Sequence, residues 1–251
     1  MNTFLLVCIV ISASFPAFSQ AITSNVYAYN QSPIIKHTGY DERTLLEGTT
    51  RDFSHLIVQD ITLKANQPNQ PTQQLDEEAV LIIKTGELTL TLGGKRKILG
   101  PGCVAVIMPG DDYRVENKAS QSLTYYLMRY TSNEMPDLDL YRLVGDSFWI
   151  DWQEMSAKAE GENRQTKAYS TIMSNRMVAQ IVKLGAGLGK QPAHSHRAAE
   201  ILVILDHPVQ VQLNGELKGA QTGDFIFVES ETAHSIYTIK SEDCTYLSLQ
   251  F

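Results

Sequence analysis

Two stretches of the chain, VLIIKTGELTLTLGGKRKILGPGCVAVI at residues 80–107 and ILVILDHPVQVQLNGELKGAQTGDFIFV at residues 201–228, align with each other without a gap. The second begins 121 residues after the first (201 − 80 = 121), and this offset pairs Gly102 with Gly223. A period of this length indicates two copies of a whole domain rather than a stack of small repeats. We therefore expect two similar domains in one chain of 251 residues.

Both copies have the pattern of β-strands. Leu88, Leu90 and Leu92 alternate with threonines, and the second copy alternates in the same way over residues 209–213. A two-residue period places one face of a strand on a core and the other toward solvent. Gly-Gly or Asn-Gly then follows, as a tight hairpin turn requires. Short strands with regular turns predict an all-β protein of two tandem jelly-roll barrels.

The repeat also divides the chain. We expect an irregular N-terminal arm, a first barrel, a connection and a second barrel, at residues 20–54, 55–131, 132–174 and 175–251 respectively. The connection contains the apolar run SFWIDW, which is unsuited to a free linker. We expect its aromatic side chains Phe148, Trp149 and Trp152 to pack against one or both barrels.

Residues 1–19, MNTFLLVCIVISASFPAFS, contain no charged side chain and end in small residues around Pro16. This pattern predicts a signal peptide that is cleaved between Ser19 and Gln20, so that the mature protein is exported to the periplasm or secreted. A buried N-terminal strand or helix is the alternative. Cleavage would leave Cys103 and Cys244, which lie in different copies and are expected to be buried free thiols rather than a disulfide.

The net charge of the chain limits the classes of molecule that it is expected to bind. Lys and Arg number 21 against 28 Asp and Glu, which gives a net charge of −7. A surface of this sign does not neutralise phosphates, so nucleic acid is not an expected partner. No apolar stretch reaches the length of a transmembrane helix. We expect a small-molecule ligand or substrate, and a homo-oligomer stays open.

A cluster of metal-ligand residue types lies in the second copy. In AHSHRAAEILVIL, residues 193–205, His194, His196 and Glu200 share the parity of one strand face. His234 follows beyond the strand FIFV. Three imidazoles and one carboxylate suit a first-row divalent ion and leave coordination positions for water or substrate. The sequence therefore predicts one metal ion in the second barrel.

The spacing H-x-H-x-x-x-E, with a further histidine eleven residues after Gly223, resembles the two signature motifs of the cupin superfamily. His207 stands where the first motif usually ends in glycine, and Glu229 and Glu231 replace the usual proline and glycine of the second. All four ligand positions are intact. Together with the repeat, the chain resembles a two-domain bicupin over about residues 55–251, each barrel a double-stranded β-helix.

Bicupins with one C-terminal metal site include the ureidoglycine aminohydrolases, and the layout is similar to theirs. That resemblance implies a manganese-assisted hydrolysis that releases ammonia, with iron, nickel, zinc or copper as alternative ions. Three functions remain open: a metalloenzyme that attacks a small polar metabolite by metal-activated water or Lewis-acid catalysis, an iron, nickel or copper dioxygenase, and a non-catalytic ligand- or metal-binding envelope protein. No catalytic residue is assigned. Candidates for side chains that support the ligands are Arg197, Gln212 and Tyr237.

The first copy lacks these ligands. The same offset places Gln73, Leu75, Ala79 and Tyr113 opposite the four ligand positions, and a slip of one residue recovers only Glu78. We therefore expect a metal-free first barrel that stabilises the second barrel or helps to close an assembly. The remaining histidines are interpreted as ordinary surface or core residues: His37, His55 and His207.

Overall fold

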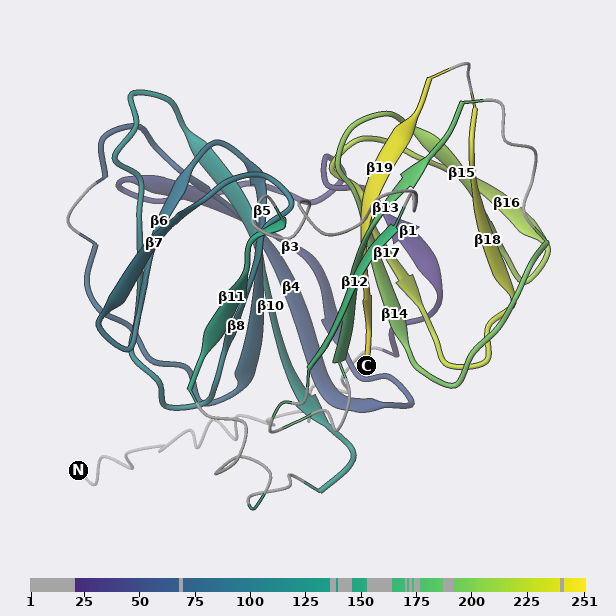
Figure 1. The fold of residues 1–251 in the computed structure, drawn as a ribbon, viewed down its shortest axis with the longest axis horizontal. Coiled ribbons are helices and arrows are strands. Elements are labelled where there is room, and N and C mark those ends of the chain that lie inside the picture. Colours follow the sequence, from purple (N-terminus) through teal and green to yellow (C-terminus); the bar gives the residue numbers. More distant parts are fainter. Residues whose placement is uncertain are drawn as a thin grey trace, which may run out of the picture.

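The computed structural model describes residues 21–67, 70–135, 139, 146–152, 164–169, 171, 173, 177–186, 192–239 and 242–251. The elements that it defines there are β-strands, and they form two barrels side by side (Figure 1). The predicted all-β, two-barrel architecture is confirmed. Within these ranges no helix is long and apolar enough to cross a membrane. The predicted signal peptide lies outside the described residues.

Barrel 1 consists of a seven-stranded sheet with the order β11-β8-β5-β10-β4-β3-β2 and a three-stranded sheet with the order β7-β6-β9. Its strands are β2 (Ile35–Lys36), β3 (Tyr40–Gly48), β4 (Phe53–Leu63), β5 (Glu78–Thr85), β6 (Leu88–Leu92), β7 (Lys95–Leu99), β8 (Val104–Ile107), β9 (Tyr113–Glu116), β10 (Leu123–Ser132) and β11 (Phe148–Ile150).

Barrel 2 consists of a six-stranded sheet with the order β1-β17-β14-β19-β13-β12 and a three-stranded sheet with the order β16-β15-β18. Its strands are β1 (Asn25–Tyr27), β12 (Arg164–Tyr169), β13 (Met177–Leu184), β14 (Glu200–Ile204), β15 (Val209–Leu213), β16 (Glu216–Ala220), β17 (Phe225–Val228), β18 (His234–Thr238) and β19 (Cys244–Gln250).

The two barrels repeat each other at the offset of 121 residues that the sequence predicts. Adding 121 to the bounds of β6, β7 and β8 gives those of β15, β16 and β17. The order β8-β5-β10-β4-β3 recurs as β17-β14-β19-β13-β12. The expected alternation also holds, because Val209, Val211 and Leu213 are buried while the glutamines between them are partly exposed.

Two strands from outside the barrel repeats extend the large sheets, and one of them joins the barrel that is more distant in the sequence. β1 precedes barrel 1 in the chain but pairs with β17 of barrel 2, whereas β11, from the connection, pairs with β8 of barrel 1. The segment 20–54 is therefore not the irregular arm that we expected, since it contains β1, β2 and β3. Each of these two strands, β1 and β11, covers a sheet edge that would otherwise present unpaired backbone groups.

The aromatic residues of the connection pack as predicted. Phe148 and Trp149 are partly buried against the main core, and Trp152 is buried. The indole nitrogen of Trp152 donates to the carbonyl oxygen of Gly102 at 2.6 Å. This anchors the end of β11 to the turn before β8.

The two large sheets face each other and share one hydrophobic core. Aromatic pairs cross the boundary, with ring centroids 5.7 Å apart for Phe53 and Phe251 and 6.0 Å apart for Tyr126 and Phe225. The Tyr126 hydroxyl donates to the carbonyl of Gly223. Gly223 has φ +82°, and a Cβ there would lie 2.3 Å from Cε of Lys84. The positive φ favours glycine at this position, where barrel 2 approaches barrel 1, although the flexible end of Lys84 could move aside.

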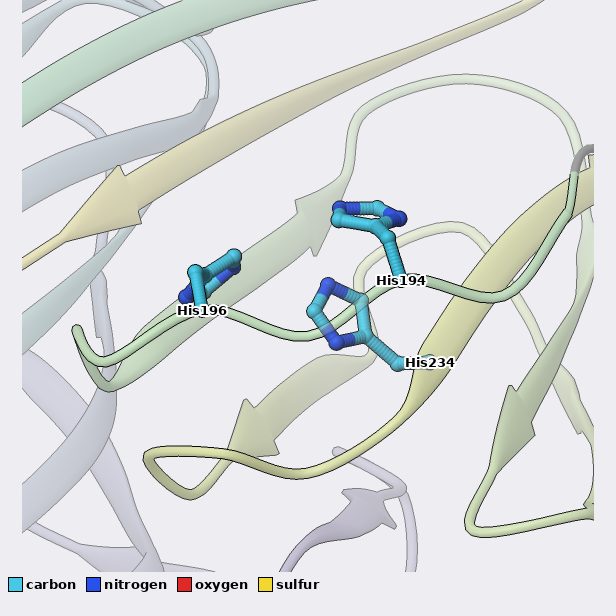
Figure 2. Close-up of side chains that lie close together, drawn as sticks. All are labelled: His194, His196 and His234. Atoms are coloured by element: carbon cyan, nitrogen blue, oxygen red, sulfur yellow. The ribbon is translucent and has the colours of Figure 1, made fainter.

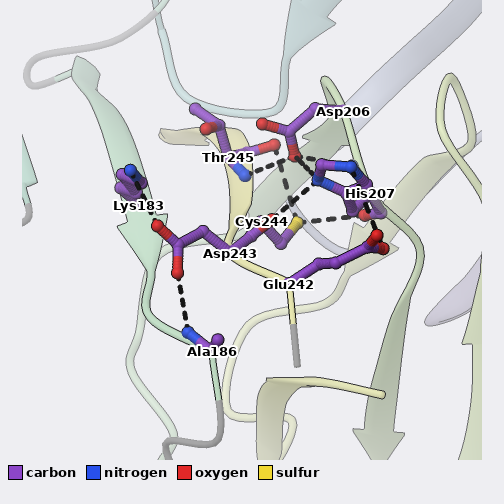
Figure 3. Close-up of polar contacts among 8 residues, drawn as sticks. All are labelled: Lys183, Ala186, Asp206, His207, Glu242, Asp243, Cys244 and Thr245. Carbon is purple, nitrogen blue, oxygen red and sulfur yellow. Dashed lines mark hydrogen bonds and ion pairs between the residues drawn. The ribbon is translucent and has the colours of Figure 1, made fainter. Parts of the chain in front are cut away.

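A polar network ties the bend after β14 to β19 (Figure 3). Asp206 Oδ1 accepts hydrogen bonds from the backbone N–H groups of His207 and Thr245, both at 2.6 Å. His207 Nδ1 donates to the carbonyl oxygen of Asp243 at 2.8 Å. His207 therefore has the structural role in a bend that the sequence suggested.

Both cysteines of the predicted mature chain are free and buried, as expected. Burial raises the pKa of the Cys103 thiol, and it raises that of Cys244 to about 12. Neither thiol is ionised near neutral pH, so neither has the character of a reactive cysteine.

Candidate metal centre

The backbone brings the two parts of the histidine motif together. His194 lies in the segment before β14 and His234 begins β18, and the two form an isolated antiparallel bridge. Their backbone N–H groups donate to each other's carbonyl oxygens at 2.9 and 2.8 Å. A further hydrogen bond, from the backbone N–H of Glu231 to the carbonyl of His196 at 2.8 Å, closes the adjacent turn.

Three imidazoles converge at this bridge. One ring nitrogen from each of His194, His196 and His234 lies within 4.8 Å of the others. Figure 2 shows the three rings gathered between the segment before β14 and the start of β18. His234 is buried, His196 is partly exposed and His194 is exposed. The cluster therefore has a buried side and a side that faces solvent.

The carboxylate of Glu200 lies on the buried side of this cluster. Its Oε2 atom is 3.0 Å from Nε2 of His234 and 3.3 Å from Nε2 of His196. Its Oε1 atom accepts hydrogen bonds from Ser248 Oγ at 2.5 Å and from Gln250 Nε2 at 3.3 Å. β19 supplies both donors, and one carboxylate oxygen is left for the histidines.

The other ring nitrogens define the histidine tautomers. Nδ1 of His196 lies 2.8 Å from the carbonyl oxygen of Ala198, and Nδ1 of His234 lies 2.9 Å from that of Thr232. A carbonyl oxygen only accepts, so each Nδ1 carries the proton. In the neutral form each imidazole then has its lone pair on Nε2, the atom available to bind a metal ion. Partners of this kind fix ligand orientation in protein metal sites.

The charges and hydrogen bonds of the cluster favour a positive charge between Glu200 and the histidine rings. Burial alone would raise the pKa of Glu200, but hydrogen bonds from His196, His234 and Ser248 outweigh burial and hold this pKa well below its usual range. The hydrogen bond to Glu200 raises the pKa of His196. With the proton on Nδ1, the Nε2 lone pair of a neutral ring would face the Oε2 carboxylate atom with no cation between them, and the His196 and His234 ring centroids are only 5.0 Å apart.

A divalent cation resolves that conflict. It accepts lone pairs from neutral imidazoles and a carboxylate together, without placing two imidazolium charges side by side. The donor set of three nitrogens and one oxygen therefore fits a first-row metal ion. Of the predicted ligands, the structure brings the three histidines into one cluster and places Glu200 against two of them.

One backbone feature marks the turn beside the cluster. Glu231 has φ 64°, in the left-handed region that non-glycine residues avoid. At the equivalent position barrel 1 has Gly110, with φ +80°, which accepts this conformation without strain. The substitution of glutamate for the motif glycine thus preserves the turn and strains it.

The three candidate supporting residues lie elsewhere. Arg197 is exposed, and Gln212 Nε2 donates to the carbonyl of Gly215 in its own hairpin at 3.1 Å. Tyr237 has the parity opposite to that of His234 on β18, so it faces away from the ligand side. The residues that hold Glu200 are Ser248 and Gln250, which sequence reasoning missed. Their two-residue spacing in the last strand was the available signal.

Barrel 1 repeats the backbone of the site without its ligands. Gln73 and Tyr113 form the bridge equivalent to that of His194 and His234, with reciprocal hydrogen bonds of 2.8 and 2.9 Å. Glu78, the one carboxylate that a register slip could offer, is fully buried and accepts hydrogen bonds from the Tyr130 hydroxyl and from the backbone N–H of Met173. Glu78 therefore has structural partners of its own.

Comparison with solved structures agrees with this description of the fold. The chain is similar to a cupin 2 conserved barrel domain protein from Leptotrichia buccalis, with a TM-score of 0.59 and 11% identity over 93% of this chain and 99% of that one. The chain has the bicupin fold. The formate complex of Lactobacillus farciminis oxalate decarboxylase matches this chain with a TM-score of 0.64 and 14% identity, over 94% of this chain and 88% of that one.

AerE from Microcystis aeruginosa is similar to this chain as well, with a TM-score of 0.63 and 13% identity over 90% of this chain and 97% of that one. No family model matches the sequence. No curated protein sequence matches it either. At these identities the likeness is one of fold, and the chemistry has to be argued from the site.

Proposed function

We propose that this bicupin is an exported metalloenzyme that binds one divalent ion, manganese in the first instance, and acts on a small polar metabolite in barrel 2. The observation that carries the proposal is the convergence of Nε2 of His196 and His234 on Oε2 of Glu200, while both Nδ1 atoms are engaged by carbonyls. His194 would complete the ligand set.

Each residue has a definable part in such a site. A bound divalent ion would supply Lewis acidity toward a polar substrate. Glu200 offsets two units of positive charge by one, and Ser248 and Gln250 hold its other oxygen in place. The carbonyls of Ala198 and Thr232 keep the imidazoles in the neutral, ligating tautomer. The exposed position of His194 leaves this side of the cluster accessible to substrate.

An enzymatic role is supported by the fold comparison, which includes an oxalate decarboxylase. The layout resembles that of ureidoglycine aminohydrolases, so oxalate and ureidoglycine are the first substrates to test. Ammonia release from ureidoglycine would indicate hydrolysis, and formate from oxalate would indicate decarboxylation. Turnover that requires dioxygen would instead favour the dioxygenase alternative. Stable metal binding without turnover of a wider metabolite panel would favour the binding-protein alternative.

The decisive experiment measures metal content. The purified protein is freed of metal with a chelator and reloaded with Mn, Fe, Ni, Zn or Cu. After desalting, the metal content is measured by inductively coupled plasma mass spectrometry. We expect one equivalent in the wild type, and none in His234→Ala. His55→Ala is the matched control, because His55 pairs with Glu77 on barrel 1 and should leave the metal content unchanged. Full metal retention in His234→Ala would contradict the proposed site.

Export is tested separately. Protein that is secreted, or released from the periplasm of an expressing cell, should have the intact mass of a chain that begins at Gln20. Recovery of the full chain from Met1 in the cytosol would overturn this part of the proposal and leave the metal site untouched.

A further inference from the structure

Barrel 1 has a cavity of about 260 Å³ that opens to solvent, at the end equivalent to the one where barrel 2 holds its histidine cluster. It lies among the strands β3, β4, β9 and β10 and beside the bridge of Gln73 and Tyr113. Leucine, isoleucine and valine side chains form much of its wall. The polar side chains that matter for its chemistry are Tyr40, Glu42, Gln59, Gln73, Tyr113 and Arg129.

Arg129 is the feature of this cavity that needs an explanation. Its Nε atom is buried and has no hydrogen-bond partner. Within the described part of the chain the guanidinium forms no ion pair either, and the nearby Glu42 is paired with His37 at 3.3 Å. The side chain is partly buried overall, and a partly buried cation without an ion-pair partner is less stable than a paired one. An arginine in this state, on the wall of a cavity, fits an anion that comes from outside the chain.

The repeat shows which residues barrel 2 has at the positions equivalent to Arg129 and its strand partner. At the offset of 121 residues, Arg129 takes the position of Gln250 and Ala79 takes that of Glu200. In barrel 2 the two residues are cross-strand partners, and the amide of Gln250 supports the carboxylate of Glu200. In barrel 1 Arg129 likewise pairs with Ala79, which has only a methyl group. Barrel 2 thus has an internal anion where barrel 1 has an internal cation.

The neighbouring groups define the rest of the ligand. Tyr113 Oη donates to Gln73 Oε1 at 2.8 Å, which leaves the Gln73 amide nitrogen as a donor on the cavity wall. Arg129 lines the same pocket as this pair. Burial raises the pKa of Tyr113, and the positive charge of Arg129 opposes that rise. Glu42 adds an acceptor and a negative charge. The carboxylate of Glu42 therefore disfavours a ligand with two negative charges and favours a ligand with a hydrogen-bond donor group.

We propose that barrel 1 is a second ligand site, in which Arg129 and Gln73 bind the carboxylate of a small organic monocarboxylate that carries a hydroxyl or amino group. The apolar walls accommodate its carbon skeleton. The site needs no metal and is separate from the proposed metal centre. The chain is then a protein with two different small-molecule sites on one repeated backbone.

Calorimetric titration of the full, metal-loaded chain tests this. The probes are lactate, alanine, 2-hydroxybutyrate and 2-aminobutyrate, each with its uncharged amide as the matched ligand. We expect saturable binding of at least one acid with one site per chain, and binding of its amide weaker by about 10- to 100-fold, because the charge-assisted hydrogen bonds to Arg129 are lost. Absence of saturable binding by all four acids, or equal binding of the amides, overturns the proposal.

Variants separate this site from the metal site. Arg129→Gln introduces the residue that barrel 2 has at this position and should weaken acid binding by about 10- to 100-fold. Arg96→Gln, on the exposed strand β7, is the matched control and should bind as the wild type does. His234→Ala should lose the metal and keep the acid, so the two proposals fail independently. Unchanged acid affinity in Arg129→Gln overturns the present one.

Thermal unfolding adds a readout that a structural role would not give. If Arg129 awaits a ligand, Arg129→Gln removes a partly buried charge that has no ion-pair partner, and the ligand-free variant should melt at the same or a higher temperature than the wild type. The acid should then raise the melting temperature of the wild type and not that of the variant. A ligand-free variant that melts well below the wild type would show that Arg129 braces the barrel, and would overturn its assignment as a ligand-binding residue.

Discussion

Barrels 1 and 2 have nearly the same backbone and opposite interior chemistry. The bridge of Gln73 and Tyr113 repeats that of His194 and His234, down to reciprocal backbone hydrogen bonds of 2.8 to 2.9 Å. The site in barrel 2 collects imidazoles and a carboxylate, whereas the cavity of barrel 1 has an amide, a phenol, the guanidinium of Arg129 and the carboxylate of Glu42. The comparison teaches that strand pairing preserves a barrel while the inward-facing side chains change its ligand.

The largest effect is expected when the four predicted metal ligands of barrel 2 are replaced by the residues at the equivalent positions of barrel 1. The combined variant is His194→Gln, His196→Leu, Glu200→Ala and His234→Tyr. We expect metal content to fall from one equivalent to none while circular dichroism still reports a folded all-β chain, because barrel 1 shows that this backbone accepts those side chains. Residual stoichiometric metal would place the ion elsewhere.

A smaller effect is expected from the residues that hold Glu200. Ser248→Ala removes the 2.5 Å hydrogen bond to Oε1 and introduces an apolar side chain, as barrel 1 does with Leu127 at the equivalent position. Metal affinity should fall by about 10- to 100-fold, as is usual when the partner of a metal ligand is lost. Competition with a chelator measures this. Ser54→Ala, which removes an exposed hydroxyl from barrel 1, should leave the affinity unchanged.

The strained turn allows a sharper comparison of stability. Glu231→Gly gives barrel 2 the glycine of barrel 1 at a left-handed position and should raise the free energy of unfolding by up to about 1 kcal/mol, since the relief of strain exceeds the entropy that glycine adds to the unfolded chain. Gly110→Glu should lower it. A Cβ at Gly110 meets no atom within 4 Å, so the backbone conformation alone is tested. Urea unfolding of both variants measures the difference.

The smallest expected effect is on the free energy of unfolding at low pH. Burial by itself would raise the pKa of Asp206, but hydrogen bonds from the backbone N–H groups of Thr245 and His207 lower it below its usual value. The ionised carboxylate therefore stabilises the fold above the unfolded-state pKa of about 3.9, and this contribution disappears as pH falls through the lower folded-state pKa.

Asp206→Asn should accordingly be less stable than the wild type at pH 7, by less than about 1 kcal/mol because the site is partly exposed. The difference should shrink below about pH 4. Barrel 1 has Thr85 at this position and lacks the carboxylate. Urea midpoints measured from pH 7 to pH 3 give the curve, and a difference that does not vary with pH would contradict the assignment.

Much of this molecule could be predicted from the sequence. The offset of 121 residues, the alternation over residues 88–92 and 209–213, and the turn glycines predict two β-barrels, because side-chain parity and positive φ are local properties of the chain. The same parity places His194, His196 and Glu200 on one face. The two free thiols and the packing of Trp152 also follow from local apolar patterns.

Only the tertiary structure decides which distant residues meet. The pairing of β1 with barrel 2 and of β11 with barrel 1, the support of Glu200 by Ser248 and Gln250, and the isolation of Arg129 in a cavity all depend on which strands become neighbours. Periodicity shows which side of a strand faces inward but not what faces it across the barrel. The metal-ligand motif can therefore be recognised in the sequence, while the unpaired cation of the other barrel emerges only when the sheets are closed.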